Sequence, residues 1–135
     1  MKRRTAILWT MALAVFGSGI AVASEPTLPA GFTTRTVAMQ DGEQIFVRSG
    51  GSGPAVLLIH GFGDTGDMWG PLAADLAKTH TVIVPDLRGM GRSSKAASGY
   101  DKKSQAGDMR AVVTALGQDH SAVVGHDIEI GRAHV

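Results

Sequence analysis

The sequence has no cysteine, a single tyrosine and, beyond its first 23 residues, no long apolar run. An exported protein without cysteine must hold its fold by core packing rather than by disulfides. No segment after the amino terminus is long and apolar enough to cross a membrane. The basic residues beyond the amino terminus are scattered, which argues against a nucleic-acid-binding surface. The chain also has no internal repeat and no low-complexity tract.

Residues 1–23 have the order of a secretory signal peptide. Three basic residues at positions 2–4 precede an apolar run that starts at Ala6 and closes on Ala-Val-Ala. This order predicts cleavage after Ala23 and a periplasmic or secreted mature protein, and the alternative is an uncleaved membrane anchor. Removal of the three basic residues, with no acidic residue in the segment, changes the formal net charge from +1 to −2.

The rest of the chain divides into a lead-in, a domain and a short tail. Residues 24–32 contain two prolines and a glycine and are predicted to be a flexible lead-in. The predicted domain, residues 33–128, opens with two short strands around Asp41-Gly42, a dipeptide typical of hairpins. Three apolar runs then predict strands: buried strands at residues 55–60 and 81–86, and a third apolar strand at 121–127 that ends in a turn.

Two helices are expected between these strands. The first covers residues 69–79, with Pro71 near its start and Leu72, Ala73 and Leu76 on its buried side. The second covers residues 100–117 and ends at a glycine. Strands that alternate with helices predict an α/β fold with a mostly parallel sheet covered on both faces.

Functional residues of such sheets follow the carboxyl ends of the strands. The loops at these positions read "HGFGD" (60–64), "DLRGMGRSS" (86–94) and "GHDIE" (125–129). In this order and spacing they resemble the α/β-hydrolase superfamily, most closely its epoxide hydrolase-like branch. The resemblance covers about residues 33–128 and implies the amino-terminal part of that fold, as far as the nucleophile elbow.

In this family the nucleophile lies on a sharp strand-to-helix turn, G-x-Nu-x-G. The resemblance places Gly125 and His126 before Asp127, the implied nucleophile, with Ile128 after it. A carboxylate can displace at a strained or activated carbon and form an alkyl-enzyme ester, which water then hydrolyses. A serine-type esterase is poorly served by aspartate. The alternative for Asp127 is a structural loop carboxylate, such as a helix N-cap.

The resemblance also assigns supporting roles. The backbone N–H groups of Phe62 and Ile128 would form the oxyanion hole. His60 and Gly61, like Gly125 and His126, would shape the loops rather than react. The side chains of Phe62 and Trp69 could line a substrate pocket or simply belong to the core. The implied substrate is a small molecule. The resemblance implies no metal, no cofactor, no nucleic-acid partner, and no membrane association after signal cleavage. It leaves the oligomeric state of the protein open.

Departures from the family pattern bear on the reaction. Gly63 stands where relatives of this branch often have proline. Haloalkane dehalogenases usually carry tryptophan after the nucleophile and asparagine in place of Phe62, and haloacetate dehalogenases often carry arginine after the nucleophile. Ile128 and Phe62 match neither, so the sequence favours epoxide opening over dehalogenation. A non-catalytic binding protein of the same fold is a third hypothesis, and the substrate remains open.

Residues 129–135 do not fit the pattern. Glu129 stands where the elbow expects glycine, and the next six residues, "IGRAHV", are the translation of a common sequencing adapter. We therefore expect native sequence to end at Ile128 and the tail to be read-through. The catalytic histidine, its orienting acid and two lid tyrosines would lie downstream, and Tyr100 cannot supply that pair. The 135-residue polypeptide is accordingly predicted to be inactive.

Overall fold

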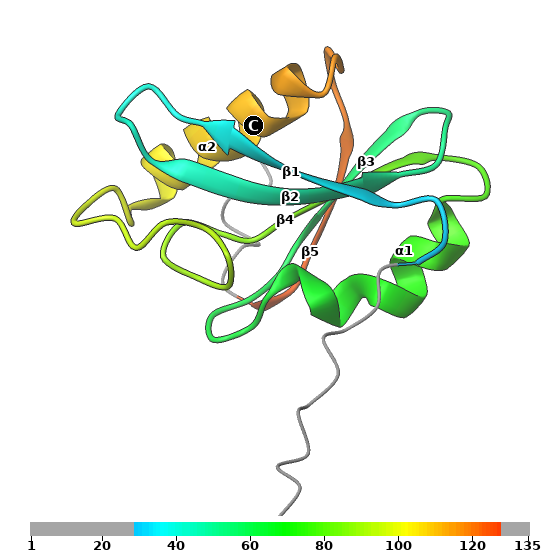
Figure 1. Cartoon of the computed structure of the whole chain (residues 1–135), viewed down its shortest axis with the longest axis horizontal. Coiled ribbons are helices and arrows are strands. Elements are labelled where there is room, and N and C mark those ends of the chain that lie inside the picture. The colour runs from blue at the N-terminus through cyan, green and yellow to red at the C-terminus, as the bar shows by residue number, and fades with distance from the viewer. Residues whose placement is uncertain (1–28, 128–135) are drawn as a thin grey trace, which may run out of the picture.

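The computed structural model describes residues 29–127 and arranges them as a five-stranded sheet between two helical layers (Figure 1). The strands are β1 (Thr33–Ala38), β2 (Gln44–Gly50), β3 (Ala55–Ile59), β4 (Thr81–Pro85) and β5 (Ala122–Gly125). The helices are the short 3₁₀ helix η1 (Gly66–Trp69), α1 (Gly70–Leu76) and α2 (Lys102–Ala115). The predicted signal peptide and the predicted read-through tail lie outside the described residues.

The hairpin predicted around Asp41-Gly42 is confirmed. Strands β1 and β2 pair antiparallel, with Val37 opposite Ile45. The turn between them places Gly42 at φ 88°, a left-handed conformation that glycine adopts at no steric cost. Phe32, the last residue of the predicted lead-in, already packs against the hydrophobic core.

The sheet has the order β1-β2-β4-β3-β5. Strands β4 and β5 both pair parallel with β3, whereas β2 pairs antiparallel with β4. The prediction of a mostly parallel α/β sheet is thereby confirmed. Because β3, β4 and β5 run in the same direction, their carboxyl ends meet at one edge of the sheet, as do the loops that follow them.

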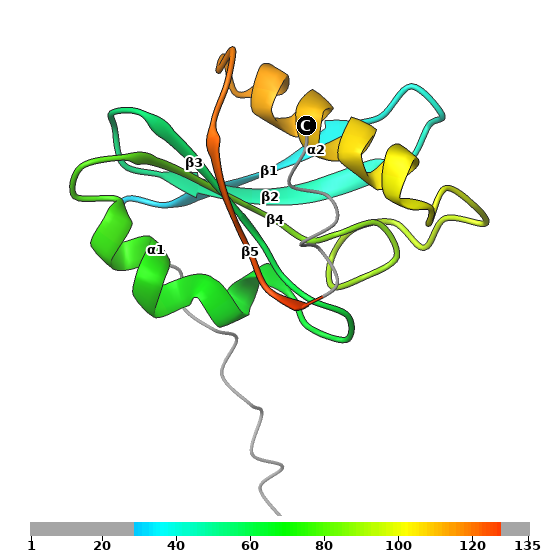
Figure 2. The ribbon, with the colours of Figure 1, turned by 180° about the vertical axis from the view of Figure 1, so that it is seen from behind.

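Both faces of β3 and β4 are buried, as predicted, whereas β5, at the edge of the described sheet, is at most half-buried. Leu57 and Ile59 of β3 join the core cluster under α2, whereas Val56 and Leu58 join the cluster under α1. Figure 2 shows α1 and α2 on opposite faces of the sheet. This alternation explains why the strand is an uninterrupted apolar run, since each successive side chain enters a different core.

Local signals set the helix ends. Pro71 stands in the first turn of α1, as expected. The side chain of Asp101 accepts the backbone N–H of Ser104 and caps the start of α2, and Gly117, just past its end, has φ 76°. The expectation for Leu72 was wrong, because its side chain is 39% exposed. The seven-residue α1 turns only Ala73 and Leu76 toward the core.

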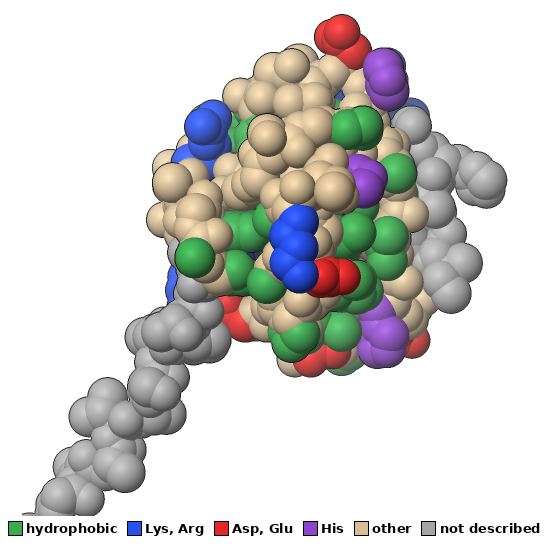
Figure 3. All heavy atoms as spheres, turned by 90° about the vertical axis from the view of Figure 1, so that its right-hand side faces the viewer, with side chains coloured by type: hydrophobic (Ala, Val, Ile, Leu, Met, Phe, Trp, Pro, Cys, Tyr) green, Lys and Arg blue, Asp and Glu red, His purple; other side chains and the backbone are tan. Residues whose placement is uncertain are grey.

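One face of the molecule carries apolar, basic and acidic side chains side by side (Figure 3). On the face drawn in Figure 3, lysine and arginine side chains are separated from one another and lie among apolar, acidic and histidine side chains. Within residues 29–127 no helix has both the length and the hydropathy needed to span a membrane.

Candidate active site

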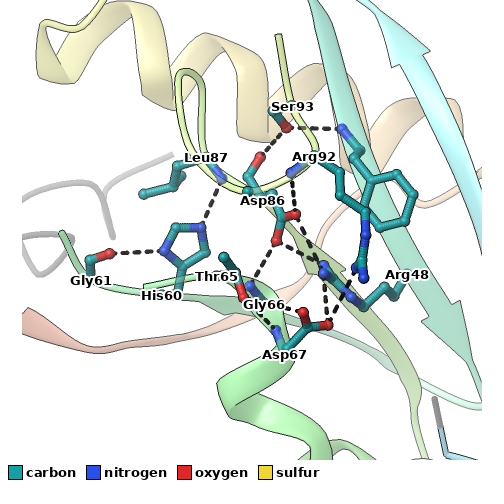
Figure 4. A network of polar contacts seen from close by, with 12 residues as sticks. Arg48, His60, Gly61, Thr65, Gly66, Asp67, Asp86, Leu87, Arg92 and Ser93 are labelled. Atoms are coloured by element: carbon teal, nitrogen blue, oxygen red, sulfur yellow. Dashed lines mark hydrogen bonds and ion pairs between the residues drawn. The ribbon is translucent and has the colours of Figure 1, made fainter. Parts of the chain in front are cut away.

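Three loops meet at the carboxyl edge of the parallel strands. The loop after β3 begins at His60, the loop after β4 begins at Asp86, and the turn after β5 carries Asp127. Figure 4 shows the first two loops joined by a dense network of hydrogen bonds and ion pairs. The sheet topology therefore brings together the three loops that the sequence motifs predicted to carry functional residues.

Asp127 has an unusual backbone conformation. Its φ is 62°, and it is the one non-glycine residue at positive φ in the part of the chain that the structure describes. An L-residue in this region costs about 1–2 kcal/mol, so the surrounding structure must impose the conformation. Just before it, the His126 N–H donates to the carbonyl oxygen of Ile59 at 3.1 Å and ties the turn to the end of β3. Strain of this kind is typical of elbow nucleophiles.

The glycine at the start of the first loop lies directly against the elbow. A Cβ placed on Gly61 would lie 2.9 Å from the Asp127 Cβ and 3.2 Å from both the Nδ1 and the carbonyl oxygen of His126. Such contacts require something to shift, so the two loops can approach this closely only with glycine here. Gly125, also predicted to shape the turn, pairs with Ile59 as the last residue of β5.

His60 links the loop after β3 to the loop after β4. Its side chain is fully buried, and its Nε2 accepts the Leu87 N–H at 2.9 Å. Since Nε2 accepts, the proton belongs on Nδ1, which lies 2.8 Å from the Gly61 carbonyl oxygen and donates to it. Both ring nitrogens are therefore occupied within the protein, which leaves none free to activate water.

A buried ion pair organises the opposite side of the first loop. Asp86 is fully buried and accepts from Arg48 Nη1 at 2.8 Å, from the Gly66 N–H at 2.7 Å and from the Arg92 N–H at 2.9 Å. Burial by itself would raise the pKa of Asp86, but the hydrogen bonds from Arg48 and the two backbone N–H groups outweigh it. The net pKa lies below its usual value, so the carboxylate is ionised at neutral pH. Arg48 also contacts Asp67 at 2.8 Å.

A second buried pair holds the β4 loop two residues further along the chain, at Arg88. Arg88 donates from Nε and Nη2 to the two carboxylate oxygens of Asp108, each at 2.8 Å, and from Nη1 to Asp41 at 2.6 Å. These bonds raise the pKa of Arg88 further above its already high value, and the bond to Arg88 lowers the pKa of Asp41. The β4 loop is thus joined to α2 and to the β1–β2 turn.

The remaining predicted site residues are in different surroundings. The Phe62 side chain, in the loop after β3, is 74% exposed. Trp69 packs against the core cluster under α1, which is one of the two alternatives that the sequence left open. Ile128 lies outside the described residues. The hydroxyl of Tyr100 donates to the Ala96 carbonyl oxygen of its own loop. Among residues 29–127, no group of three or more potential ligands could hold a metal ion.

Sequence reasoning missed the buried charges. Arg48, Asp86, Arg88 and Asp108 are each at most 4% exposed, and none had been assigned a role. One signal was available: a charged residue inside or directly after an apolar strand run, as at Arg48 and Asp86, is rarely buried unless it is paired.

Comparison with known proteins agrees with this geometry. Residues 54–128, more than half of the chain, match the family model described as alpha/beta hydrolase fold. The chain therefore belongs to the α/β-hydrolase fold family, and it is an epoxide hydrolase-like member of this family of hydrolases.

Individual relatives support the same placement. A soluble epoxide hydrolase of Corynebacterium sp. (strain C12) is 40% identical over 94 residues, which cover 70% of this chain and 33% of that protein. A fluoroacetate dehalogenase of Burkholderia sp. is 43% identical over 83 residues, 58% of this chain and 27% of its own length. The solved structure of an epoxide hydrolase from an endophytic Streptomyces superposes with a TM-score of 0.69 at 38% identity, covering 73% of this chain and 30% of that one. The chain thus spans about a third or less of these relatives.

Proposed function

We propose that the whole protein to which this chain contributes opens epoxides, with Asp127 as the nucleophile. The observation that carries the proposal is the left-handed backbone of Asp127 at the end of β5, directly against Gly61 of the first loop. A structural aspartate that caps a helix has extended backbone geometry instead, as Asp101 does at φ −69° and ψ 155°.

In the proposed reaction the Asp127 carboxylate attacks one epoxide carbon. The carbon–oxygen bond of the ring breaks, the ring oxygen takes up a proton from a general acid outside the described residues, and an alkyl-enzyme ester forms. Water then adds to the ester carbonyl, loses its proton to an imidazole–carboxylate pair, and drives the carbonyl electrons onto oxygen. The N–H groups of Phe62 and Ile128 would stabilise this oxyanion. When the oxyanion collapses, the ester carbon–oxygen bond breaks and the leaving alkoxide takes the proton of the newly formed carboxyl group. This releases the diol and restores the Asp127 carboxylate, and the proton held by the imidazole returns to the general acid that protonated the ring oxygen.

The general base belongs to a part of the protein outside the described residues. His60 is fully engaged, and His126 directly precedes Asp127 in the turn and lies against Gly61. His80 and His120 precede β4 and β5 and so lie at the opposite edge of the sheet. We accordingly propose that the 135-residue chain alone does not turn over substrate. We also propose that the protein is exported and that the mature chain begins at Ser24.

A dehalogenase is the second candidate, favoured by the fluoroacetate dehalogenase relative. It would use the same nucleophile with a halide as leaving group. The two are separated by incubating the whole protein with styrene oxide and with fluoroacetate and measuring diol and free halide. The proposal predicts diol, no halide, and loss of diol in Asp127→Asn. Halide without diol would favour the dehalogenase, and neither product would favour a non-catalytic binding protein.

A further inference from the structure

The loop between β3 and η1 is held at both ends by two consecutive residues. At its start, the Leu87 N–H donates to His60 Nε2 at 2.9 Å. At its end, the Asp86 carboxylate accepts the Gly66 N–H at 2.7 Å. Figure 4 shows both bonds reaching the loop from the end of β4. Residues 61–65, including Phe62, therefore lie between two residues, His60 and Gly66, that are each hydrogen-bonded to the segment at the end of β4.

The anchor at Gly66 has little freedom to move. Asp86 is fully buried, and Arg48 donates to both of its carboxylate oxygens, at 2.8 and 3.3 Å. A Cβ on Gly66 would lie 2.6 Å from Arg48 Nη1 and 2.8 Å from the Val84 Cγ1, so backbone and ion pair are in direct contact. A displacement of Asp86 would consequently be transmitted to the loop.

The same loop touches the elbow on its other side. Gly61 lies against the Asp127 Cβ, closely enough that an added Cβ would be only 2.9 Å away. The position of the Phe62 N–H relative to Asp127 thus depends on where the loop is held. Asp86 itself lies behind the loop and serves as an acceptor for Arg48 and two backbone N–H groups.

We propose that Asp86, fixed by Arg48, is a positioning residue for the ester-hydrolysis step, because it holds the 60–66 loop where the Phe62 N–H meets the oxyanion formed at Asp127. The inference rests on the proposed function. Only the second half-reaction builds negative charge on the ester carbonyl oxygen, so displacement of the epoxide needs this N–H far less than hydrolysis does. A positioning role therefore predicts a selective defect, whereas a general loss of structure would slow both half-reactions.

The chain supplies a matched control in Asp108. Each carboxylate receives two bonds from an arginine with 3% side-chain exposure: Asp86 from Arg48, and Asp108 from Arg88. Each arginine also contacts a second, more exposed aspartate, Asp67 or Asp41. Asp108 accepts no bond from the 60–66 loop in the described contacts, so Asp108→Ala removes a similar buried pair without touching that loop.

The test is rapid-quench single-turnover kinetics of the whole protein with styrene oxide. The alkyl-enzyme ester is detected as an increase in the mass of the intact protein. Compared with Asp108→Ala, Asp86→Ala should form the ester at a similar rate and hydrolyse it roughly tenfold to a hundredfold more slowly, so the ester accumulates. Equal ratios of hydrolysis to ester formation in the two variants would overturn the positioning role.

Two further features keep the test decisive. If Asp86→Ala does not fold, the milder pair Asp86→Asn and Asp108→Asn is compared by the same ratio. Hydrogen exchange of the 60–66 peptide gives a second readout, and it should accelerate in the Asp86 variant and not in the Asp108 variant. A parent protein that forms no ester overturns the proposed function, whereas an ester in the parent with equal ratios in the variants overturns only the role of Asp86.

Discussion

Replacement of Asp127 by glycine should make the protein more stable than replacement by alanine. The residue has φ 62°, and its side chain is exposed. Alanine keeps the left-handed strain, whereas glycine relieves about 1–2 kcal/mol of it. Glycine also gains roughly 0.5–1 kcal/mol more backbone entropy on unfolding, which opposes the gain. The expected net advantage of Asp127→Gly over Asp127→Ala is therefore between about 0 and 1.5 kcal/mol, with a central value of about 0.75 kcal/mol.

The decisive result is which of the two variants is more stable, because a protein with glycine at a given position is ordinarily less stable than the same protein with alanine there. Gly107 provides the reference: it lies in α2 with ordinary helical geometry, and the space that a Cβ would occupy is open. There, Gly107→Ala should stabilise the protein by about 1 kcal/mol. Urea unfolding of all three variants measures both effects. If alanine proves the more stable residue at position 127 as well, the strained-elbow reasoning is refuted.

Three other perturbations test the surrounding contacts. Gly61→Ala should destabilise the protein by about 1–3 kcal/mol in urea unfolding, because its Cβ would lie 2.9 Å from that of Asp127. Arg48→Met should cost about 3–5 kcal/mol of unfolding free energy, since it leaves Asp86 buried and unpaired, whereas Lys78→Met at an exposed pair should leave the urea midpoint nearly unchanged. The stabilisation that comes from the lowered pKa of Asp86 should be complete above about pH 4 and should fall as the pH drops through the folded-state pKa. The free energy of unfolding, measured from pH 6 to pH 2, should therefore depend less on pH in Asp86→Asn than in the parent protein.

Much of the fold could be predicted because each signal was local. The uninterrupted run at residues 55–59 required burial on both faces, and Asp41-Gly42 and Gly117 specified a turn and a helix end. Leu72 was misassigned because α1 is a single short helix with few inward positions, and periodicity cannot fix the orientation of so short a segment.

For the candidate site, the sequence predicted the positions of its residues along the chain but not the contacts between them. The order of the three loops located Asp127 and the segment around Phe62, but no spacing rule links Arg48 to Asp86, which lie 38 residues apart. Their pairing depends on β2 lying beside β4, a non-sequential neighbour relationship that periodicity does not encode. The contact between Gly61 and the elbow likewise arises from the pairing of β3 with β5.

The most direct test of the central claim is a single turnover of the whole protein, in molar excess over styrene oxide, in water enriched in oxygen-18. If Asp127 forms an ester that water hydrolyses at its carbonyl carbon, the label should enter the carboxylate of the peptide containing Asp127, and the diol should carry none. Label in the diol with an unlabelled Asp127 would mean that water attacks the epoxide directly, and the assignment of Asp127 as the nucleophile would be wrong.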